Sequence, residues 1–266
     1  MKVALCFFGI TRNLRAHTLP SLQSCLMAAL AEKDPHYRKF GHFNLIASVS
    51  NARAGENNIP VDPDQYKLLE CDAVSTTDQG WLDNHLDFAA IEKFGDVWED
   101  HYASLKNLLR QLYSLEQVTE LLLGAKERFD LVVYSRADLR FERKVELPRI
   151  RPRTLYTSWF GKGGGLNDRF AMGDFDTMIK YGQRGRLASQ YCEETGKPLH
   201  AERFLFWSTK KGGLRRADLT SIDFSRVRAN GTVPEWDVLV KTRAKDRRTR
   251  AWSRLKNFVL RESDPS

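Results

Sequence analysis

The sequence predicts an α/β sandwich with a mostly parallel central sheet. Two continuous apolar runs, at residues 2–9 and 129–135, show no polar alternation, which is typical of strands covered on both faces. Segments with leucines and alanines at helical spacing, at 20–31 and 98–123, alternate with the predicted strands. Strands alternating with helices are typical of a sheet with helices on both sides. A length of 266 residues suits one such domain with additions.

The first half of the chain gives five further expectations. The first strand ends in Gly9, and a second strand is expected over 42–49. The polar segment 51–64 contains two prolines and is predicted to be a loop, followed by a short strand over 66–69. The helix over 98–123 is expected to break once near Ser114.

The second half begins with the strongest internal strand, which is rich in β-branched and aromatic residues. After it we expect a strand over 154–159, a glycine-rich loop over 161–165, and a helix capped by Asp174 or Asp176. The last compact segment begins with residues 201–207.

Composition excludes several classes of protein. Hydrophobic residues make up 42% and charged residues 29%, which excludes wholesale disorder. No apolar run approaches the roughly 18–20 residues of a membrane span, and the first apolar run is too short for a signal peptide. The four scattered cysteines indicate reduced core residues of a cytoplasmic protein.

The positive charge is concentrated at the end of the chain. The net charge is +8, and residues 241–266 hold nine basic and three acidic residues. We therefore divide the chain into a domain over 1–235 and a basic amphipathic tail over 236–266. Apolar residues at helical spacing in the tail favour an anionic membrane surface. Docking on the body is an equal alternative, and contact with nucleic acid through the tail is a less favoured one.

Two groups of polar residues close the strongest strands. Gly9 and Arg12 follow the first strand, and Arg136 and Asp138 end the strand over 129–135. Open α/β sheets bind ligands where strands end, so these residues can meet a phosphate group. Asp138 is the candidate ligand for a divalent cation. The alternatives are a surface turn for the first group and an Arg–Asp ion pair for the second.

Two later groups add polar side chains. Asn167, Asp168 and Arg169 follow three successive glycines, which can form a loop that closes over a ligand. His200 and Glu202 can supply a general base or metal ligand. The alternatives are a solvent loop for the first group and an ordinary helix start for the second.

Taken in order, these segments resemble a family of bacterial and viral glycosyltransferase-like proteins with a GT-A-type, Rossmann-like nucleotide-sugar-binding fold. The resemblance covers about residues 2–210. It is carried by Gly9, Arg12, Leu112–Leu115, the run from Phe129 to Leu139, the run from Asn167 to Gly173, Met178, Tyr181 and Glu202. Arg136 replaces the first aspartate of the family's DxD motif, and an arginine can supply part of a cation's charge.

The resemblance implies a glycosyltransferase that moves a hexosyl or deoxyhexosyl group from a nucleoside-diphosphate sugar to a polysaccharide or glycolipid acceptor, at the inner membrane face. It implies nucleotide-sugar binding by Gly9, Arg12, Arg136, Asn167 and Arg169, Mn²⁺ or Mg²⁺ on Asp138, and catalysis by Asp168 and Glu202. Trp159 either stacks against a sugar ring or is a core residue. The alternative function is a non-catalytic nucleotide- or glycan-binding protein of the same fold.

Overall fold

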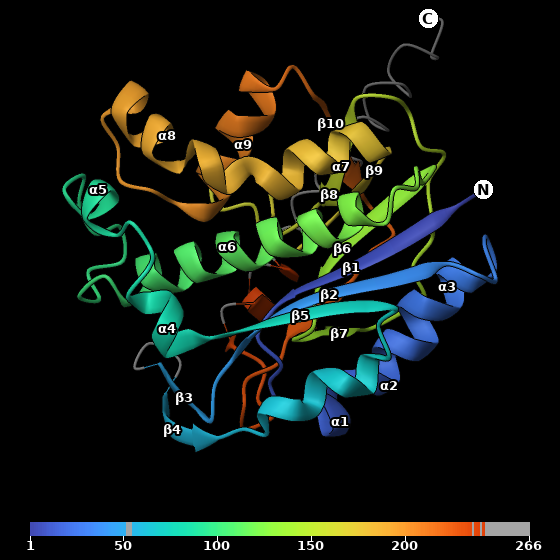
Figure 1. The fold of residues 1–266 in the computed structure, drawn as a ribbon, viewed down its shortest axis with the longest axis horizontal. Helices are drawn as coiled ribbons and strands as arrows, with labels where there is room; N and C mark the ends of the chain where they lie inside the picture. Colours follow the sequence, from blue (N-terminus) through green and yellow to red (C-terminus); the bar gives the residue numbers. More distant parts are fainter. Residues whose placement is uncertain (52–54, 236, 240, 243–266) are drawn as a thin grey trace, which may run out of the picture.

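The computed structural model describes residues 1–51, 55–235, 237–239 and 241–242 (Figure 1). Its centre is a seven-stranded sheet in the order β10-β8-β9-β6-β1-β2-β5. The strands are β1 (Val3–Gly9), β2 (Arg38–Leu45), β5 (Ala73–Asp78), β6 (Leu131–Arg136), β8 (Thr154–Ser158), β9 (Phe170–Gly173) and β10 (Arg215–Leu219). Within the sheet only β9 runs against its neighbours, β6 and β8.

Helices cover both faces of the sheet (Figure 1). One face carries α1 (Leu14–His17), α2 (Leu19–Ser21), the π-helical turn η1 (Leu22–Met27) and α3 (Ala28–Ala31). The other carries α6 (Ala103–Gly124), α7 (Phe175–Gly182), the 3₁₀ segment η4 (Gln183–Leu187), α8 (Ala188–Thr195) and α9 (Ala201–Lys211). The short helices α4 (Gln79–Asp83) and α5 (Ala89–Glu92) lie beyond the end of β5. The predicted α/β sandwich with a mostly parallel central sheet is confirmed.

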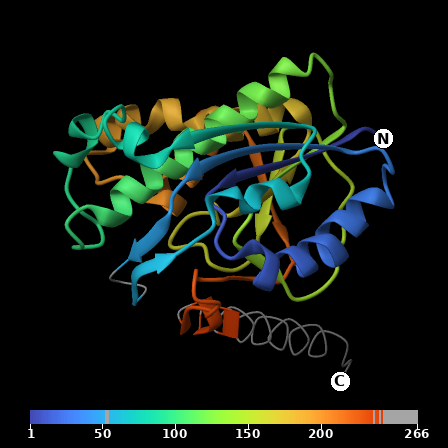
Figure 2. The ribbon, with the colours of Figure 1, turned by 60° about the horizontal axis from the view of Figure 1, so that its bottom comes forward.

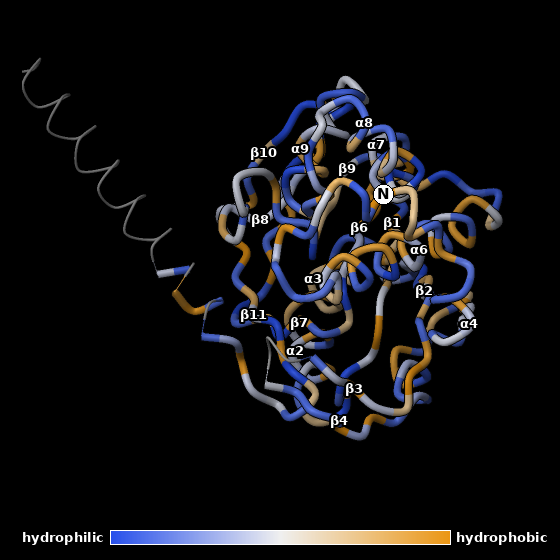
Figure 3. Tube along the Cα trace, turned by 90° about the vertical axis from the view of Figure 1, so that its left-hand side faces the viewer, coloured by the Kyte–Doolittle hydropathy of each residue, from blue (hydrophilic) through white to orange (hydrophobic). Residues whose placement is uncertain are grey.

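The strands are apolar throughout because each face of the sheet is buried under helices. Alternate residues of β1 enter different core clusters: Val3, Leu5 and Phe7 pack with the α1–α3 side. Ala4, Cys6 and Phe8 pack with α6 and α7. The hydropathy colours show the same arrangement, with hydrophobic strands inside and hydrophilic loops around them (Figure 3). This double burial explains why periodicity-free runs predicted β1 and β6.

Several local predictions are corrected. The predicted loop over 51–64 contains a strand, β4 (Glu56–Pro60), which pairs with β3 (Ser48–Asn51). The single strand expected over 42–49 is instead two strands, because β2 ends at Leu45 and β3 begins at Ser48. Residues 66–69 belong to a 3₁₀ helix, η3 (Pro63–Leu69), in which Asp62 accepts the cap bond from the backbone N–H of Asp64. A separate two-stranded antiparallel sheet pairs β7 (Leu139–Phe141) with β11 (Phe224–Arg226).

Helix α6 is continuous through Ser114, where a break was predicted. The Ser114 hydroxyl is buried and donates to the His42 carbonyl over 2.8 Å, while it accepts from the Gly9 N–H over 2.7 Å. The polar side chain therefore joins α6 to β1 and β2, and it leaves the helix intact.

Three further sequence predictions concern the basic tail, membrane spans and the cysteines. The basic tail over 236–266 lies outside the described residues, except for 237–239, 241 and 242. No helix within the described ranges is long and apolar enough to cross a membrane. The four cysteines are free thiols, with Cys6 and Cys192 buried and the other two half-buried.

Candidate active site

The direction of β9 brings the predicted site residues together. The strands β1 and β6 are parallel, so Gly9 and Arg136 lie at the same edge of the sheet. Because β9 is antiparallel to β6, its first residue, Phe170, pairs with Ser135 near the end of β6. The Arg136 N–H then donates to the Arg169 carbonyl over 3.2 Å. Gly9, Arg136 and Arg169, which are far apart in the sequence, therefore lie at one end of the sheet.

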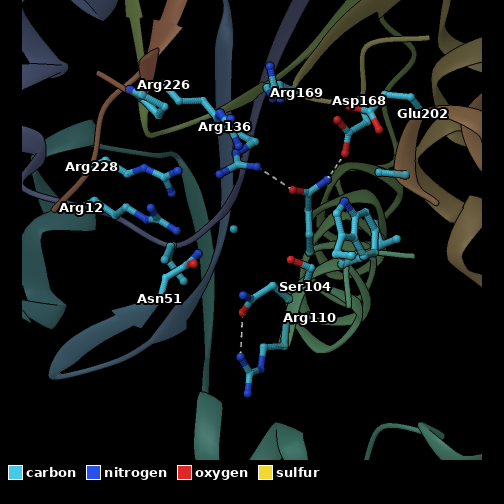
Figure 4. A pocket seen from close by; sticks show the side chains of 18 of the residues that line it. Arg12, Asn51, Ser104, Arg110, Arg136, Asp168, Arg169, Glu202, Arg226 and Arg228 are labelled. Atoms are coloured by element: carbon cyan, nitrogen blue, oxygen red, sulfur yellow. Dashed lines mark hydrogen bonds between the residues drawn. The ribbon is translucent and has the colours of Figure 1, made fainter. Parts of the chain in front are cut away.

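A cleft of about 730 Å³ opens at this edge. Its lining includes six of the predicted site positions: Gly9, Arg12, Arg136, Asp168, Arg169 and Glu202. In the close view, Arg12, Arg136, Arg226 and Arg228 lie on one side, and Asp168 and Glu202 lie on the other (Figure 4). We call Arg12, Arg136, Arg169, Arg226 and Arg228 the arginine wall.

The end of β11 and the residues that follow it supply two arginines of this wall. Arg226 ends β11 and Arg228 lies two residues further on, while Val227 between them is fully buried. The Val227 N–H donates to the Asp138 carbonyl over 2.9 Å, which fixes this segment beside the end of β6. The second view shows the same segment close to the β3–β4 hairpin (Figure 2).

Buried carboxylates hold the arginines in pairs. Arg226 makes a bidentate contact with Asp237 at 2.8 and 2.7 Å, and Arg169 lies 3.9 Å from the same carboxylate. Glu56 on β4 is shared by Arg12 at 3.4 Å and Arg228 at 3.6 Å. Its other oxygen accepts from the Ala229 N–H over 2.7 Å. Acidic residues behind the cleft therefore position the cations at its surface.

Asp138, the predicted metal ligand, is 1% exposed and does not line the cleft. Both of its oxygens accept from Arg136, with Nε–Oδ1 at 2.8 Å, and Arg12 Nε lies 3.9 Å from Oδ2. Burial would raise the pKa of Asp138, but the charges of Arg136 and Arg12 outweigh burial and lower it. The ion pair weighed as an alternative is thus present.

This arrangement does not fit a divalent cation on Asp138. Its oxygens are engaged with guanidinium groups, and a cation there would lie among like charges. Among the described residues, no group of three or more His, Cys, Asp or Glu side chains is placed to hold a metal ion.

The opposite side of the cleft holds two carboxyl groups with different pKa values. Burial, followed by the charge of Asp168, raises the pKa of Glu202 to about 7. For Asp168 burial acts in the same direction, but the charges of Arg169, Arg136 and Arg184 lower its pKa. At neutral pH Asp168 is ionised and Glu202 is close to its midpoint. Divergent pKa values in adjacent carboxyl groups are typical of an acid–base pair.

The start of α9 and the glycine loop position Glu202. His200 occupies the cap position of α9 and Glu202 its first turn, with His200 Nδ1 3.3 Å from Glu202 Oε2. The Leu166 N–H donates to the Glu202 carbonyl over 3.0 Å. A Cβ on Gly165 would lie 1.9 Å from that carbonyl oxygen, so only glycine permits this contact.

Asn167 differs from the other predicted binding residues. It is fully buried and does not line the cleft. Its amide donates to the Phe160 carbonyl over 3.2 Å, and its oxygen accepts from the Arg169 N–H over 3.0 Å. These bonds fix the turn that leads into β9, and therefore the directions of Asp168 and Arg169. Trp159 is a core residue whose indole donates to the Ile222 carbonyl over 3.1 Å.

Four of the cleft residues that were not predicted bear on the argument. Gln111 on α6 accepts from Arg136 over 2.8 Å and donates to Asp168 over 2.7 Å, which links the two sides of the cleft. Arg226 and Arg228 alternate with buried Val227, a pattern that could have indicated a strand with one charged face. Trp98 lines the cleft and stacks on His200 at 5.4 Å.

No protein-family model and no curated protein sequence matches the chain. Among solved structures, the chain is similar to the crystal structure of mouse xyloside xylosyltransferase 1 in its apo form. The sequences are 12% identical, the match covers 82% of this chain and 85% of that chain, and the TM-score is 0.42.

Proposed function

We propose that the chain is a glycosyltransferase that uses a nucleoside-diphosphate sugar. The observation that supports this proposal most strongly is the placement of the arginine wall opposite an ionised and a half-ionised carboxyl group in one cleft. Glycosyl transfer needs positive charge at the departing diphosphate, and an inverting enzyme also needs a group that accepts a proton from the acceptor hydroxyl. Arginine and carboxyl side chains suited to these two roles line the cleft at the sheet edge where α/β folds bind ligands.

The arginine wall supports the first requirement. Guanidinium groups bind phosphate oxygens through paired N–H donors, and fixed positive charge in a partly buried site stabilises a developing anion. Arg12 and Arg136 side chains are 12% and 17% exposed, so they reach the cleft but are shielded from bulk water. Charges held in place before the reaction need no reorganisation as the diphosphate departs.

Glu202 supports the second requirement. A general base works best when its pKa lies near the working pH, and Glu202 has a pKa of about 7. We assign to it the proton of the acceptor hydroxyl. Asp168 stays ionised beside Arg169 and Arg136, so we assign to it the orientation of the transferred sugar. A polysaccharide or glycolipid acceptor, and contact of the tail with an anionic membrane, remain proposals supported by sequence alone.

Nucleotide titration combined with a turnover assay tests this function. UDP, GDP and dTDP are titrated calorimetrically into the full chain, and hydrolysis of the corresponding sugar nucleotides is then measured. We expect micromolar to millimolar binding of at least one nucleotide, and slow donor hydrolysis that Glu202→Gln reduces. Nucleotide binding with no hydrolysis or transfer would favour the non-catalytic binding protein, and absence of binding to all three would reject the glycosyltransferase.

A further inference from the structure

We propose that the arginine wall binds the donor's diphosphate without a divalent cation, and that Arg12 and Arg228 are its direct contacts. This inference rests on the proposed function and specifies how the same site holds its ligand. It adds Arg228, which no sequence motif indicated, to the binding residues.

The first support is charge balance. The five guanidinium groups of the arginine wall are accompanied by three carboxylates, Glu56, Asp138 and Asp237. The wall therefore has two more positive charges than these three carboxylates balance, and the ionised Asp168 across the cleft offsets part of this excess. A nucleoside-diphosphate sugar carries roughly one negative charge on each of its two phosphates, so the net positive wall attracts this ligand without an added cation.

The second support is the uneven pairing of these arginines. Arg136 and Arg226 each engage their own carboxylate in a bidentate contact. Arg12 and Arg228 share Glu56 at 3.4 and 3.6 Å, and that carboxylate also accepts from the Ala229 backbone. Both contacts with Glu56 are 3.4 Å or longer, so the guanidinium groups of Arg12 and Arg228 are held less tightly than those of Arg136 and Arg226. These two side chains are therefore the better placed to donate to an anion.

The third support is mutual repulsion within the wall. Burial, then the charges of Arg226 and Arg12, lowers the pKa of Arg228 to about 10. Burial lowers the pKa of Arg12. The charge of Asp138 offsets part of this effect, and the charge of Arg136 lowers the pKa further. An anion would relieve this repulsion, whereas a divalent cation would increase it.

The segment that carries Arg228 is fixed before any ligand binds. Val227 is tied to the Asp138 carbonyl, Ala229 to Glu56, and the Arg228 N–H donates to the Thr232 carbonyl over 2.8 Å. Little ordering of the backbone is then required on binding, which favours affinity.

Calorimetric titration of the full chain tests the inference. UDP, GDP, dTDP and inorganic pyrophosphate are each titrated with a chelator present, and again with Mn²⁺. We expect the Kd of the preferred nucleoside diphosphate to differ by less than threefold between the two conditions. We expect Arg228→Met to raise that Kd at least tenfold with an unchanged or higher Tm, and Arg228→Lys to have an intermediate effect.

The matched control is Arg128→Met, which removes an arginine from an exposed pair with Asp176 at 2.8 Å. It should leave the Kd unchanged. Binding that requires Mn²⁺ would overturn the inference and leave the proposed function standing, as would an unchanged Kd in both Arg228 variants. Binding of pyrophosphate without any nucleoside diphosphate would support the metal-free anion site and reject the proposed function. Absence of all binding would reject both.

Discussion

The side-chain amide of Gln111 donates to Asp168 Oδ2 over 2.7 Å. The oxygen of the same amide accepts from Arg136 over 2.8 Å, so one residue of α6 holds a cation and a carboxylate of the cleft in fixed relation. Gln111 therefore links the proposed leaving-group site to the proposed sugar site by two hydrogen bonds.

Replacement of Gln111 should impair turnover more than folding. Gln111→Met removes both bonds, and we expect kcat/KM to fall about 10–100-fold because small errors of position are costly in catalysis. Tm should change by only a few degrees. Gln111→Glu places a carboxylate against Asp168 and should raise its pKa, which a pH–rate profile detects. Gln190→Glu, beside Glu194 on the exposed side of α8, is the matched control; equal profiles for the two variants would contradict the role of Gln111.

The pKa of Glu202 predicts the pH dependence of the rate. If Glu202 accepts the proton, activity should rise about tenfold per pH unit below pH 7 and level off above it, because only the ionised form is a base. Glu202→Gln should remove this limb and lower kcat at least 100-fold. A wild-type profile that is flat from pH 5.5 to 8 would show that another group takes the proton.

Glu202 also predicts a pH-dependent change in stability. Its pKa is raised from the ordinary 4.5 to about 7, so the folded state binds the proton more tightly than the unfolded chain does. The resulting stabilisation is present at acid pH and is lost as pH rises through about 7. Glu202→Gln should therefore raise Tm by a few degrees at pH 8 and have little effect at pH 5. The opposite order, measured by thermal unfolding at both pH values, would contradict the burial of this carboxyl group.

Asp138 is predicted to stabilise the fold as well as the site. Asp138→Asn leaves Arg136 without its bidentate partner, and removal of one member of a buried ion pair typically costs about 3–5 kcal/mol. We expect Tm to fall on the order of 10 °C. The double variant Asp138→Asn/Arg136→Met should lose less than the sum of the two single losses, because it leaves fewer unpaired charges. Additive losses would show that the pair does not interact.

Ser114 is predicted to position the loop that carries Arg12. Its hydroxyl donates to the His42 carbonyl, so it must accept from the Gly9 N–H and from His42 Nδ1–H. Burial lowers the pKa of His42 to about 4, which keeps this ring neutral. Ser114→Ala should cost about 1–3 kcal/mol, because buried partners lose their bonds, and should raise the nucleotide Kd. Thr119→Val, which removes a buried hydroxyl elsewhere on α6, should destabilise without changing the Kd.

The sequence predicted the parts of the site that follow buried strands. Gly9 and Arg136 were found because an apolar run that stops at a polar residue marks the end of a strand, and parallel strands end at one edge. The strand β4 was missed because its residues are polar and include Pro60. The predicted helix break at Ser114 was wrong because the serine hydroxyl bonds to Gly9 on β1 and His42 on β2, and the sequence does not show these partners.

The remaining site residues depend on contacts between distant segments. Glu56 and Arg228 lie 172 positions apart, and no local pattern relates them. Gln111 occupies an ordinary position in a leucine-rich helix, so only the packing of α6 on the sheet reveals its two partners. Asp138 was predicted as a metal ligand, but its carboxyl group is buried against Arg136 and Arg12 and does not line the cleft. The spacing of an Arg-x-Asp motif does not determine this arrangement.

The central claim is that one cleft binds the diphosphate of a sugar nucleotide on its arginine wall. The most direct measurement is a crystal structure of the full chain with the nucleoside diphosphate that binds best in titration. We predict diphosphate oxygens within hydrogen-bond distance of Arg12 and Arg228, with the β-phosphate directed toward Asp168 and Glu202. A nucleotide bound elsewhere, or one whose phosphates point away from these arginines, would contradict the claim.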